Sequence, residues 1–240
     1  MKSSVVAYLL RDSNKNIDML EILPLPNARV LAASDSGVLL EHNGIYLLSC
    51  DAGTDADYLP LLVEGLADDP ERMIVLHSPA LKDELVATYG FQAFLDVRHG
   101  VYRKTEPVAY SLPEGAQIRQ LDESHLSFVL QHYHMMDDEA YLRERIDAGM
   151  YGAFVGGELA GFIGTHDEGS IGLLEVLPEY RRLGLAFALE AYLINRLVEQ
   201  GRIPFTQVSV DNEPSLALQR KLGMELTDAT VHWLVRGSVH

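Results

Sequence analysis

The chain has 240 residues, a formal net charge of −16 and 48% hydrophobic residues, so it can bury a core and is not a disordered chain. Its negative charge excludes the usual nucleic-acid and acidic-membrane binders, no apolar run reaches the length of a membrane span, and the first residues are not those of a signal peptide. These features predict no nucleic-acid and no membrane partner. The single cysteine, Cys50, rules out an internal disulfide, so we expect a cytoplasmic protein.

The first half of the chain alternates helical and strand-like segments. Helical periodicity covers 4–22 and breaks near 12–15, and three strand-like runs follow. The last two of these runs flank Asn43-Gly44, which is a strong hairpin signal. The remaining apolar segments of this half predict a helix, a strand, a helix and a strand, over 58–66, 73–77, 81–88 and 94–103.

A proline-containing stretch then separates two candidate domains. Pro107 and Pro113 fall in a segment without helical or strand-like periodicity, which predicts a linker over 106–113. We therefore expect one domain over 1–105 and a second over 114–240. The length of the chain is compatible with two small domains of this size.

The second domain begins with a strand, two helices and a hairpin. After a short strand over 117–121, Asp122 is placed to cap the first helix, and a second helical pattern covers 137–148. Two strand-like runs around Gly156-Gly157 predict a hairpin.

A strand, a sharp turn and a helix meet at Arg181-x-x-Gly184-x-Ala186. The apolar run 171–176 predicts a buried strand, which Pro178 ends because proline lacks an N–H for the ladder, and a long amphipathic helix follows. The first N–H groups of a helix have no intrahelical partners and lie at the positive end of the helix dipole. With a glycine that lets a ligand approach the backbone, the turn predicts a site for phosphate or pyrophosphate.

A second block further along the chain again combines a strand, a turn and a helix. Val208 to Val210 alternate as a short strand, and Asn212 is placed in an Asx turn or as a helix cap. Pro214 suits a first helical turn, and Gly223 suits the residue after the last one. The block therefore predicts a short helix over 215–222.

The two blocks together resemble the GNAT superfamily of acyltransferases. Arg181-x-x-Gly184-x-Ala186 is similar to the signature by which that family holds the pyrophosphate of acetyl-CoA, and the run from Asn212 to Met224 is similar to its later motif. The resemblance implies an α/β (α+β) GNAT fold, with a mixed central sheet flanked by helices. Within the superfamily, the run from Pro178 to Leu185 looks like the glycine N-acyltransferase-like group.

The resemblance also implies a co-substrate and the residues that bind it. The co-substrate is acetyl-CoA or another acyl-CoA, and backbone groups near Val176 bind its pantetheine and polarise the thioester carbonyl. The cofactor-binding residues that the resemblance implies are Glu175, Val176, Arg181, Arg182, Leu183, Gly184, Leu185, Ala186 and Asn212.

The implied reaction is direct acyl transfer to an amine, which must be neutral to attack. Glu175 on the motif strand and His166 in the loop before it are the candidate catalytic bases, with Glu168 as a further carboxylate in that loop. The tyrosine that often protonates the departing thiolate in this family falls at Gln219, and an amide is no proton donor of useful acidity. No Cys/His cluster has ligand spacing, so we predict no metal.

An internal offset of 133 residues aligns Gly90 with Gly223 and brings other identities and the order of elements into register. It predicts two tandem GNAT-like domains, of which the N-terminal one is degenerate. The N-terminal equivalent of the phosphate turn carries Asp51, Asp55 and Asp57, which would repel a phosphate. Only the C-terminal copy is therefore expected to bind the cofactor. Two unrelated small domains are the alternative.

The sequence leaves two functions open. The first is an N-acyltransferase that moves an acetyl or related acyl group from acetyl-CoA to a primary amine of a small molecule or amino acid. The second is a catalytically weak, acyl-CoA-binding regulatory protein on the same scaffold, which Gln219 favours. The acidic composition favours a cationic acceptor such as an amine. Acceptor identity and oligomeric state stay open.

Overall fold

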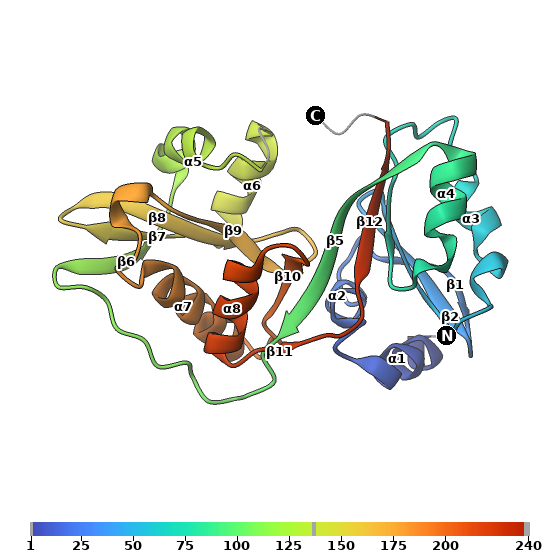
Figure 1. Ribbon diagram of the computed structural model, residues 1–240, viewed down its shortest axis with the longest axis horizontal. Helices are drawn as coiled ribbons and strands as arrows, with labels where there is room; N and C mark the ends of the chain where they lie inside the picture. The colour runs from blue at the N-terminus through green and yellow to red at the C-terminus, as the bar shows by residue number, and fades with distance from the viewer. Residues whose placement is uncertain (1, 136–137, 238–240) are drawn as a thin grey trace. The chain divides into compact units, whose positions relative to one another are not determined.

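The computed structural model describes residues 2–135 and 138–237, which divide into two compact units (Figure 1). Unit 1 combines the first part of the chain with two segments from its end, and unit 2 takes the remainder. Strand β10 (Phe205–Ser209) and helix α8 (Glu213–Leu222) run across the division. Unit 1 comprises Met1–Gly100, Gln207–Ala217 and Glu225–His240, and unit 2 comprises Val101–Thr206 and Leu218–Met224.

Unit 1 is built on a mixed sheet with the strand order β1-β2-β3-β4-β12-β5, and β11 pairs with β5 off this path. Neighbouring strands are antiparallel except β3 and β4, which are parallel. Its strands are β1 (Arg29–Ser34), β2 (Gly37–His42), β3 (Ile45–Cys50), β4 (Met73–Leu76), β5 (Phe91–Val101), β11 (Glu225–Leu226) and β12 (Val231–Arg236). Its helices are α1 (Lys2–Leu9), α2 (Ile17–Ile22), α3 (Leu59–Val63) and α4 (Lys82–Tyr89).

The predicted hairpin of unit 1 is confirmed between β2 and β3. Asn43 and Gly44 have φ angles of 49° and 83°, and a two-residue type I′ turn requires positive φ at both positions. Along β3, Leu47 and Leu48 point to opposite faces of the sheet. Leu47 joins the core beneath α1 and α2, whereas Leu48 joins the core beneath α3 and α4. Helices therefore cover both faces of this sheet.

Unit 2 contains the strand order β10-β9-β8-β7-β6, in which β9 and β10 are parallel and the other neighbours are antiparallel. Phe162 of β8 packs in the core beneath α5 and α6, and Ile163 packs on the opposite face beneath α7. The elements not yet given are β6 (Ala116–Gln120), α5 (Leu126–His132), α6 (Glu139–Gly149), β7 (Tyr151–Val155), β8 (Glu158–Thr165), β9 (Ile171–Val176) and α7 (Leu185–Glu199). The predicted helix over 137–148 corresponds to α6, and its first position, Asp137, lies outside the described residues.

The two units share one order of elements. Each has two helices, three antiparallel strands, a helix, a strand parallel to the third one, and a further helix. Unit 2 adds β6 in front of this series. The order within unit 2 is the one that the sequence predicts, and its recurrence in unit 1 agrees with two copies of one architecture.

The last strand departs from the predicted domain boundaries. The sequence assigns 114–240 to one domain, whereas β12 lies between β4 and β5 in the sheet of unit 1. Trp233 of β12 is opposite Val75 on one side and Leu95 on the other. Pairing of this kind joins residues far apart in the chain, and a local sequence pattern carries no information about it.

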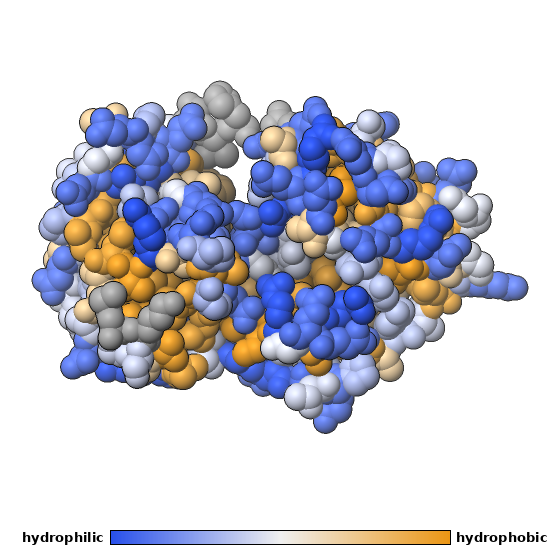
Figure 2. Space-filling view, turned by 180° about the vertical axis from the view of Figure 1, so that it is seen from behind, coloured by the Kyte–Doolittle hydropathy of each residue, from blue (hydrophilic) through white to orange (hydrophobic). Residues whose placement is uncertain are grey.

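Hydrophilic side chains cover much of the surface in the view of Figure 2, which agrees with a net charge of −16. Leu183 is one of the large apolar side chains that are exposed. None of the helices in the described ranges combines the length and the apolar character that crossing a membrane requires.

Candidate functional site

Strand β9 contains one extra residue where it pairs with β8. Phe162 lies opposite Glu175 and Gly164 lies opposite Gly172, so two steps along β8 match three steps along β9. Leu173 lies within this bulge and has a φ of 51°, a left-handed conformation that costs a non-glycine residue about 1–2 kcal/mol. Bulges of this type re-aim side chains and are common beside active sites.

One edge of β9 is not paired with β10 beyond its first residue. In the part of the chain that the structure describes, Thr206 and Ile171 form the one register pair between these strands. The amide of Leu177 donates to the carbonyl oxygen of Ala160, next to the β8 ladder, at 3.0 Å. Because backbone groups alternate along an antiparallel ladder, the N–H of Val176 points to the edge away from β8. A hydrogen-bond donor is thus presented on that edge.

The turn between β9 and α7 exposes further backbone donors. Gly184 stands at the N-cap of α7 and supplies no side-chain cap, and a Cβ built on it would meet no atom within 4 Å. None of the amides of 182–187 donates a hydrogen bond within the described residues. Arg182 and Gly184 have φ angles of 65° and 80°, and left-handed residues of this kind form concave groups of amides that bind anions. These donors lie at the positive end of a helix of 15 residues.

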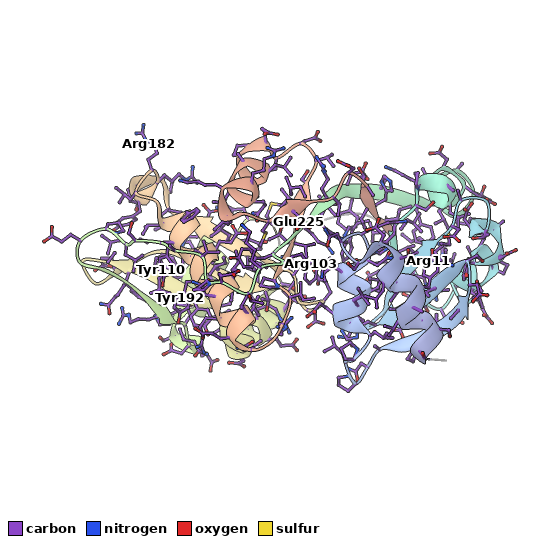
Figure 3. All side chains as sticks on the ribbon, turned by 90° about the horizontal axis from the view of Figure 1, so that it is seen from below. Arg11, Arg103, Tyr110, Arg182, Tyr192 and Glu225 are labelled. Atoms are coloured by element: carbon purple, nitrogen blue, oxygen red, sulfur yellow. The ribbon has the colours of Figure 1, made fainter. Side chains whose placement is uncertain are left out.

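Two arginines flank the exposed amides. Arg181 bends back over the end of β9, donating from Nε to the carbonyl oxygen of Val176 at 3.0 Å and from Nη2 to Glu175 Oε1 at 3.2 Å. Arg182 points away from the body of its unit (Figure 3) and makes no ion pair with any residue that the structure describes. Arg182 and the N-terminal end of the helix dipole offer positive charge at this turn, whereas Arg181 is paired with Glu175.

The structure places eight of the nine predicted cofactor-binding residues on this one strand, turn and helix, from Glu175 to Ala186. Asn212 lies in unit 1, where its Oδ1 accepts a hydrogen bond from the amide of Ser215 at 3.1 Å. It thereby caps α8, which the sequence predicts as one of its two local roles. Its contact with a cofactor stays a prediction.

Glu175 lies beside a buried tyrosine. Burial, with a smaller contribution from the Glu175 carboxylate, raises the pKa of Tyr133 to about 12. Tyr133 packs edge-on against Phe162, with ring centroids 6.4 Å apart, so these three side chains share one face of β8 and β9. The phenol of Tyr133 therefore stays protonated near neutral pH next to a candidate base.

His166 lies near the other end of β9. Its Nδ1 is 2.8 Å from the hydroxyl of Tyr141, the two rings stack, and burial raises the pKa of that tyrosine. A Cβ on Gly172 would overlap Nε2 of His166, so the ring lies against the backbone of β9. Glu175 is three residues further along, roughly 10 Å for a strand. The structure thus places the two candidate bases at separate positions along β9.

Glu168 is held within its own loop. Its Oε1 accepts a hydrogen bond from Ser170 Oγ at 2.6 Å, and both residues are buried. This contact gives the carboxylate a structural partner away from the turn. Glu175 and His166 therefore remain the two candidates for the base.

A buried carboxyl group that the sequence analysis did not single out lies beside Gln219. Glu190 of α7 is 1% exposed and Gln219 is 2% exposed. Burial raises the pKa of Glu190 to about 7, and a hydrogen bond from Gln219 offsets part of the rise. Glu190 Oε2 and Gln219 Oε1 have no partner among the described residues, whereas a protonated Glu190 would donate to the amide oxygen. The sequence feature that could have identified Glu190 is its position on the apolar face of a predicted helix.

We expect Glu190→Gln to alter how stability depends on pH. The pKa of Glu190 is raised in the folded state, so its stabilisation is complete below the unfolded value and is lost as pH rises through about 7. Between the pKa of Glu190 in the unfolded chain and its pKa in the folded state, this residue should lower the wild-type free energy of unfolding by about 1.4 kcal/mol per pH unit. Glutamine has no proton to lose, so the variant lacks this dependence. In thermal melts, the melting temperature of the variant should rise relative to that of the wild type between pH 5 and pH 8.

The matched control for this experiment is Glu199→Gln, in the last turn of the same helix, whose side chain is 63% exposed. It removes the same charge from solvent and should leave the pH dependence of the melting temperature unchanged. If wild type and Glu190→Gln melt in parallel across this range, Glu190 is not a buried neutral acid.

A family model described as FR47-like protein matches residues 148–234, a span that contains the whole strand, turn and helix described above. This model is related to the GNAT acetyltransferases. No curated protein matches the chain.

Solved structures resemble nearly the whole chain. A Drosophila protein is 16% identical with a TM-score of 0.74, covering 98% of this chain and 95% of its own. A GCN5-related N-acetyltransferase from Kribbella flavida is 15% identical with a TM-score of 0.64, covering 95% and 96%. A tandem GNAT protein from the clavulanic acid biosynthesis pathway is 17% identical with a TM-score of 0.54, covering 94% and 89%. The chain therefore has the predicted GNAT fold, a mixed sheet flanked by helices, in two tandem copies.

Proposed function

We propose that the chain is an N-acyltransferase that uses acetyl-CoA, or a related acyl-CoA, to acylate the primary amine of a small molecule or amino acid. The observation that carries this proposal is the turn after β9. Exposed amides, two arginines and a helix N-terminus meet there, directly after a strand whose edge presents the N–H of Val176. Such a turn binds pyrophosphate, and such an edge binds an extended chain.

The equivalent turn in unit 1 is unsuited to phosphate, which favours a single cofactor site per chain. There the amide of Gly53 donates to Asp55 Oδ1 at 3.2 Å, and the amide of Thr54 donates to the carbonyl oxygen of Asp51 at 3.1 Å. Carboxylates thus occupy the position that Arg181 and Arg182 have in unit 2, and they repel phosphate. We accordingly assign cofactor binding to unit 2 and treat unit 1 as a degenerate copy.

Acyl-CoA supplies an activated acyl thioester in this proposal. The N–H of Val176 is the donor assigned to the thioester carbonyl oxygen, and stabilisation of this type contributes about 3–4 kcal/mol in other acyl-transfer enzymes. The C–N bond forms as the C–S bond breaks, the amine proton passes to Glu175 or His166, and CoA leaves as thiolate or thiol. Because a thiol has a pKa of about 8.5, its departure near neutral pH needs little help from an acid. This fits Gln219, whose side chain is turned into the core toward Glu190.

The acceptor class follows from amine chemistry. An α-amino group with a pKa of about 7.7–8.0 is partly neutral at pH 7, whereas a lysine side chain with a pKa of about 10.4 is almost wholly protonated. An α-amine therefore demands less of the base. The acidic composition and the resemblance to the glycine N-acyltransferase-like group agree with a small amino-containing acceptor in the cytoplasm.

The second candidate function is acyl-CoA binding without turnover, for regulation. The specific observation in its favour is Gln219, buried at the position where the related family often has its acid. Turnover of acetyl-CoA with a panel of amino acids and small amines separates the two functions. Release of free thiol that depends on the amine supports the enzyme, and binding without release supports the regulator.

The first test is calorimetric titration of the full chain with acetyl-CoA, with free CoA as comparison. We expect saturable binding at one site per chain, because only the turn of unit 2 combines amides without internal partners with two arginines. Asp55→Asn with Asp57→Asn should leave the affinity almost unchanged. Absence of binding at millimolar ligand would overturn the proposed function, and a large loss in the aspartate variant would show that unit 1 also binds.

A further inference from the structure

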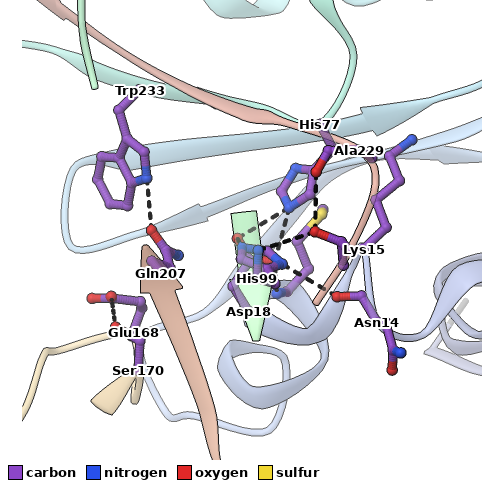
Figure 4. A network of polar contacts seen from close by, with 12 residues as sticks. Asn14, Lys15, Asp18, His77, His99, Glu168, Ser170, Gln207, Ala229 and Trp233 are labelled. Carbon is purple, nitrogen blue, oxygen red and sulfur yellow. Dashed lines mark hydrogen bonds and ion pairs between the residues drawn. The ribbon is translucent and has the colours of Figure 1, made fainter. Parts of the chain in front are cut away.

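Three buried side chains of unit 1 converge on one point, although they are far apart in the sequence (Figure 4). Asp18 lies on α2, His77 directly follows β4, and His99 lies on β5. All three side chains are 0% exposed. A search for ligand spacing along the chain misses this cluster, because Asp18 and His77 are 59 residues apart.

The separations between these groups suit ligands of one metal ion. His77 Nε2 is 2.8 Å from Asp18 Oδ1, and His99 Nε2 is 3.8 Å from Asp18 Oδ2. All three ligand atoms lie within 4.8 Å of one another. With zinc–nitrogen and zinc–oxygen distances of about 2.0–2.2 Å, two ligands of a tetrahedral ion are about 3.3 Å apart. The observed separations lie on either side of that value.

The far nitrogen of each histidine is fixed by the backbone. Nδ1 of His77 is 3.1 Å from the carbonyl oxygen of Leu48, and Nδ1 of His99 is 3.2 Å from the carbonyl oxygen of Asn14. A carbonyl oxygen only accepts hydrogen bonds, so both Nδ1 atoms carry protons. Both Nε2 atoms then face Asp18. Backbone carbonyls orient metal-binding histidines in the same way.

A single proton accounts for only part of this arrangement. A proton on His77 Nε2 satisfies the contact with Asp18 at 2.8 Å. The 3.8 Å between His99 and Asp18 exceeds a hydrogen bond. A cation among the three ligand atoms would instead contact the Asp18 carboxylate and both imidazoles at once.

We propose that Asp18, His77 and His99 bind one divalent transition metal ion, with Zn²⁺ as the best match. Two imidazoles and one carboxylate are ligands that zinc accepts, and they leave one position of a tetrahedral ion for a water molecule. The ion would join α2 to the ends of β4 and β5, which places it in the core of unit 1 as a structural centre. It is separate from the exposed turn of unit 2 and takes no part in the proposed acyl transfer.

The test uses the full chain, freed of metal with a chelator and titrated with Zn²⁺ against a chromophoric competitor. We expect one ion per chain and a higher melting temperature with zinc, because an ion that binds only the folded state stabilises it. His99→Gln and Asp18→Asn should each weaken zinc binding by about a hundredfold or more. His232→Gln is the matched control, since His232 bonds Asp96 at 2.7 Å in the same unit but outside the cluster, and it should keep the wild-type affinity.

Co²⁺ provides a readout that does not depend on the variants folding. Wild-type protein loaded with Co²⁺ should show the intense visible absorption of a four-coordinate site, and Zn²⁺ should displace it. No zinc binding by the wild type, or zinc binding that His99→Gln leaves unchanged in a folded protein, would overturn the proposal. A proton between His77 and Asp18 would then hold the cluster as a buried ion pair.

Discussion

Replacing Gly184 by glutamate is expected to lower the affinity for acetyl-CoA by about a hundredfold or more. The new carboxylate would lie at the N-cap of α7, where a Cβ meets no atom within 4 Å and the amides face outward. Like charges about 4 Å apart repel by about 4 kcal/mol at the effective dielectric constant near a protein surface, and 1.4 kcal/mol is tenfold in affinity. Calorimetric titration of both proteins with acetyl-CoA measures the effect.

The matched control is Gly201→Glu, just beyond the other end of the same helix. Gly201 also has a positive φ, 74°, and equally open surroundings. Both substitutions force a left-handed side chain at a cost of about 1–2 kcal/mol of stability, but only the first adds charge at the proposed pyrophosphate site. Equal affinities for acetyl-CoA in the two variants would show that the turn after β9 is not part of the binding site.

The second large effect is expected in turnover. Glu175→Gln should lower kcat by about a hundredfold or more, because general-base catalysis contributes about 10²–10⁴ and an amide cannot accept the proton. Affinity for acetyl-CoA should change little, since the amide oxygen can still accept from Arg181, which now bonds Oε1 at 3.2 Å. Steady-state rates with a responsive amine, combined with the calorimetric affinity, separate the two quantities.

Glu179→Gln is the control for this change, because it removes the same charge from an exposed position in the same turn. It should keep the wild-type kcat. If Glu175→Gln turns over normally, Glu175 is excluded and His166→Gln becomes the decisive variant. His166 is then the remaining candidate, and its contact with Tyr141 explains how the ring is oriented.

The part of the site that could be predicted from sequence is the part that is local in the chain. Pro178 after an apolar run and Gly184 before an amphipathic one mark the end of a strand and the start of a helix, and the structure has β9 and α7 at those places. The left-handed backbone of Arg182 and Leu173 could not be predicted in this way, because neither residue type favours positive φ. Leu173 is buried in the core beneath α5 and α6, so its conformation depends on segments distant in the chain.

Contacts between distant segments were outside the reach of sequence patterns. Asp18 meets His77 across 59 residues, so spacing rules for metal ligands missed the cluster. The buried pairing of Glu190 with Gln219 was missed for the same reason. The helices on either side of each sheet were predictable, because the apolar periodicity of a helix reports that one of its faces is buried.

The position of β12 has a consequence for the order in which the chain folds. The register of Trp233 with Val75 means that the sheet of unit 1 lacks a central strand until 231–236 has been synthesised, after the main stretch of unit 2. Domains usually fold from the N-terminus onward during synthesis. Here the sheet of unit 1 cannot be completed before β12 is made. Most of unit 2 comes from one continuous stretch, Val101–Thr206, which is synthesised earlier. The edges of β4 and β5 that β12 covers therefore stay unpaired until 231–236 has been made.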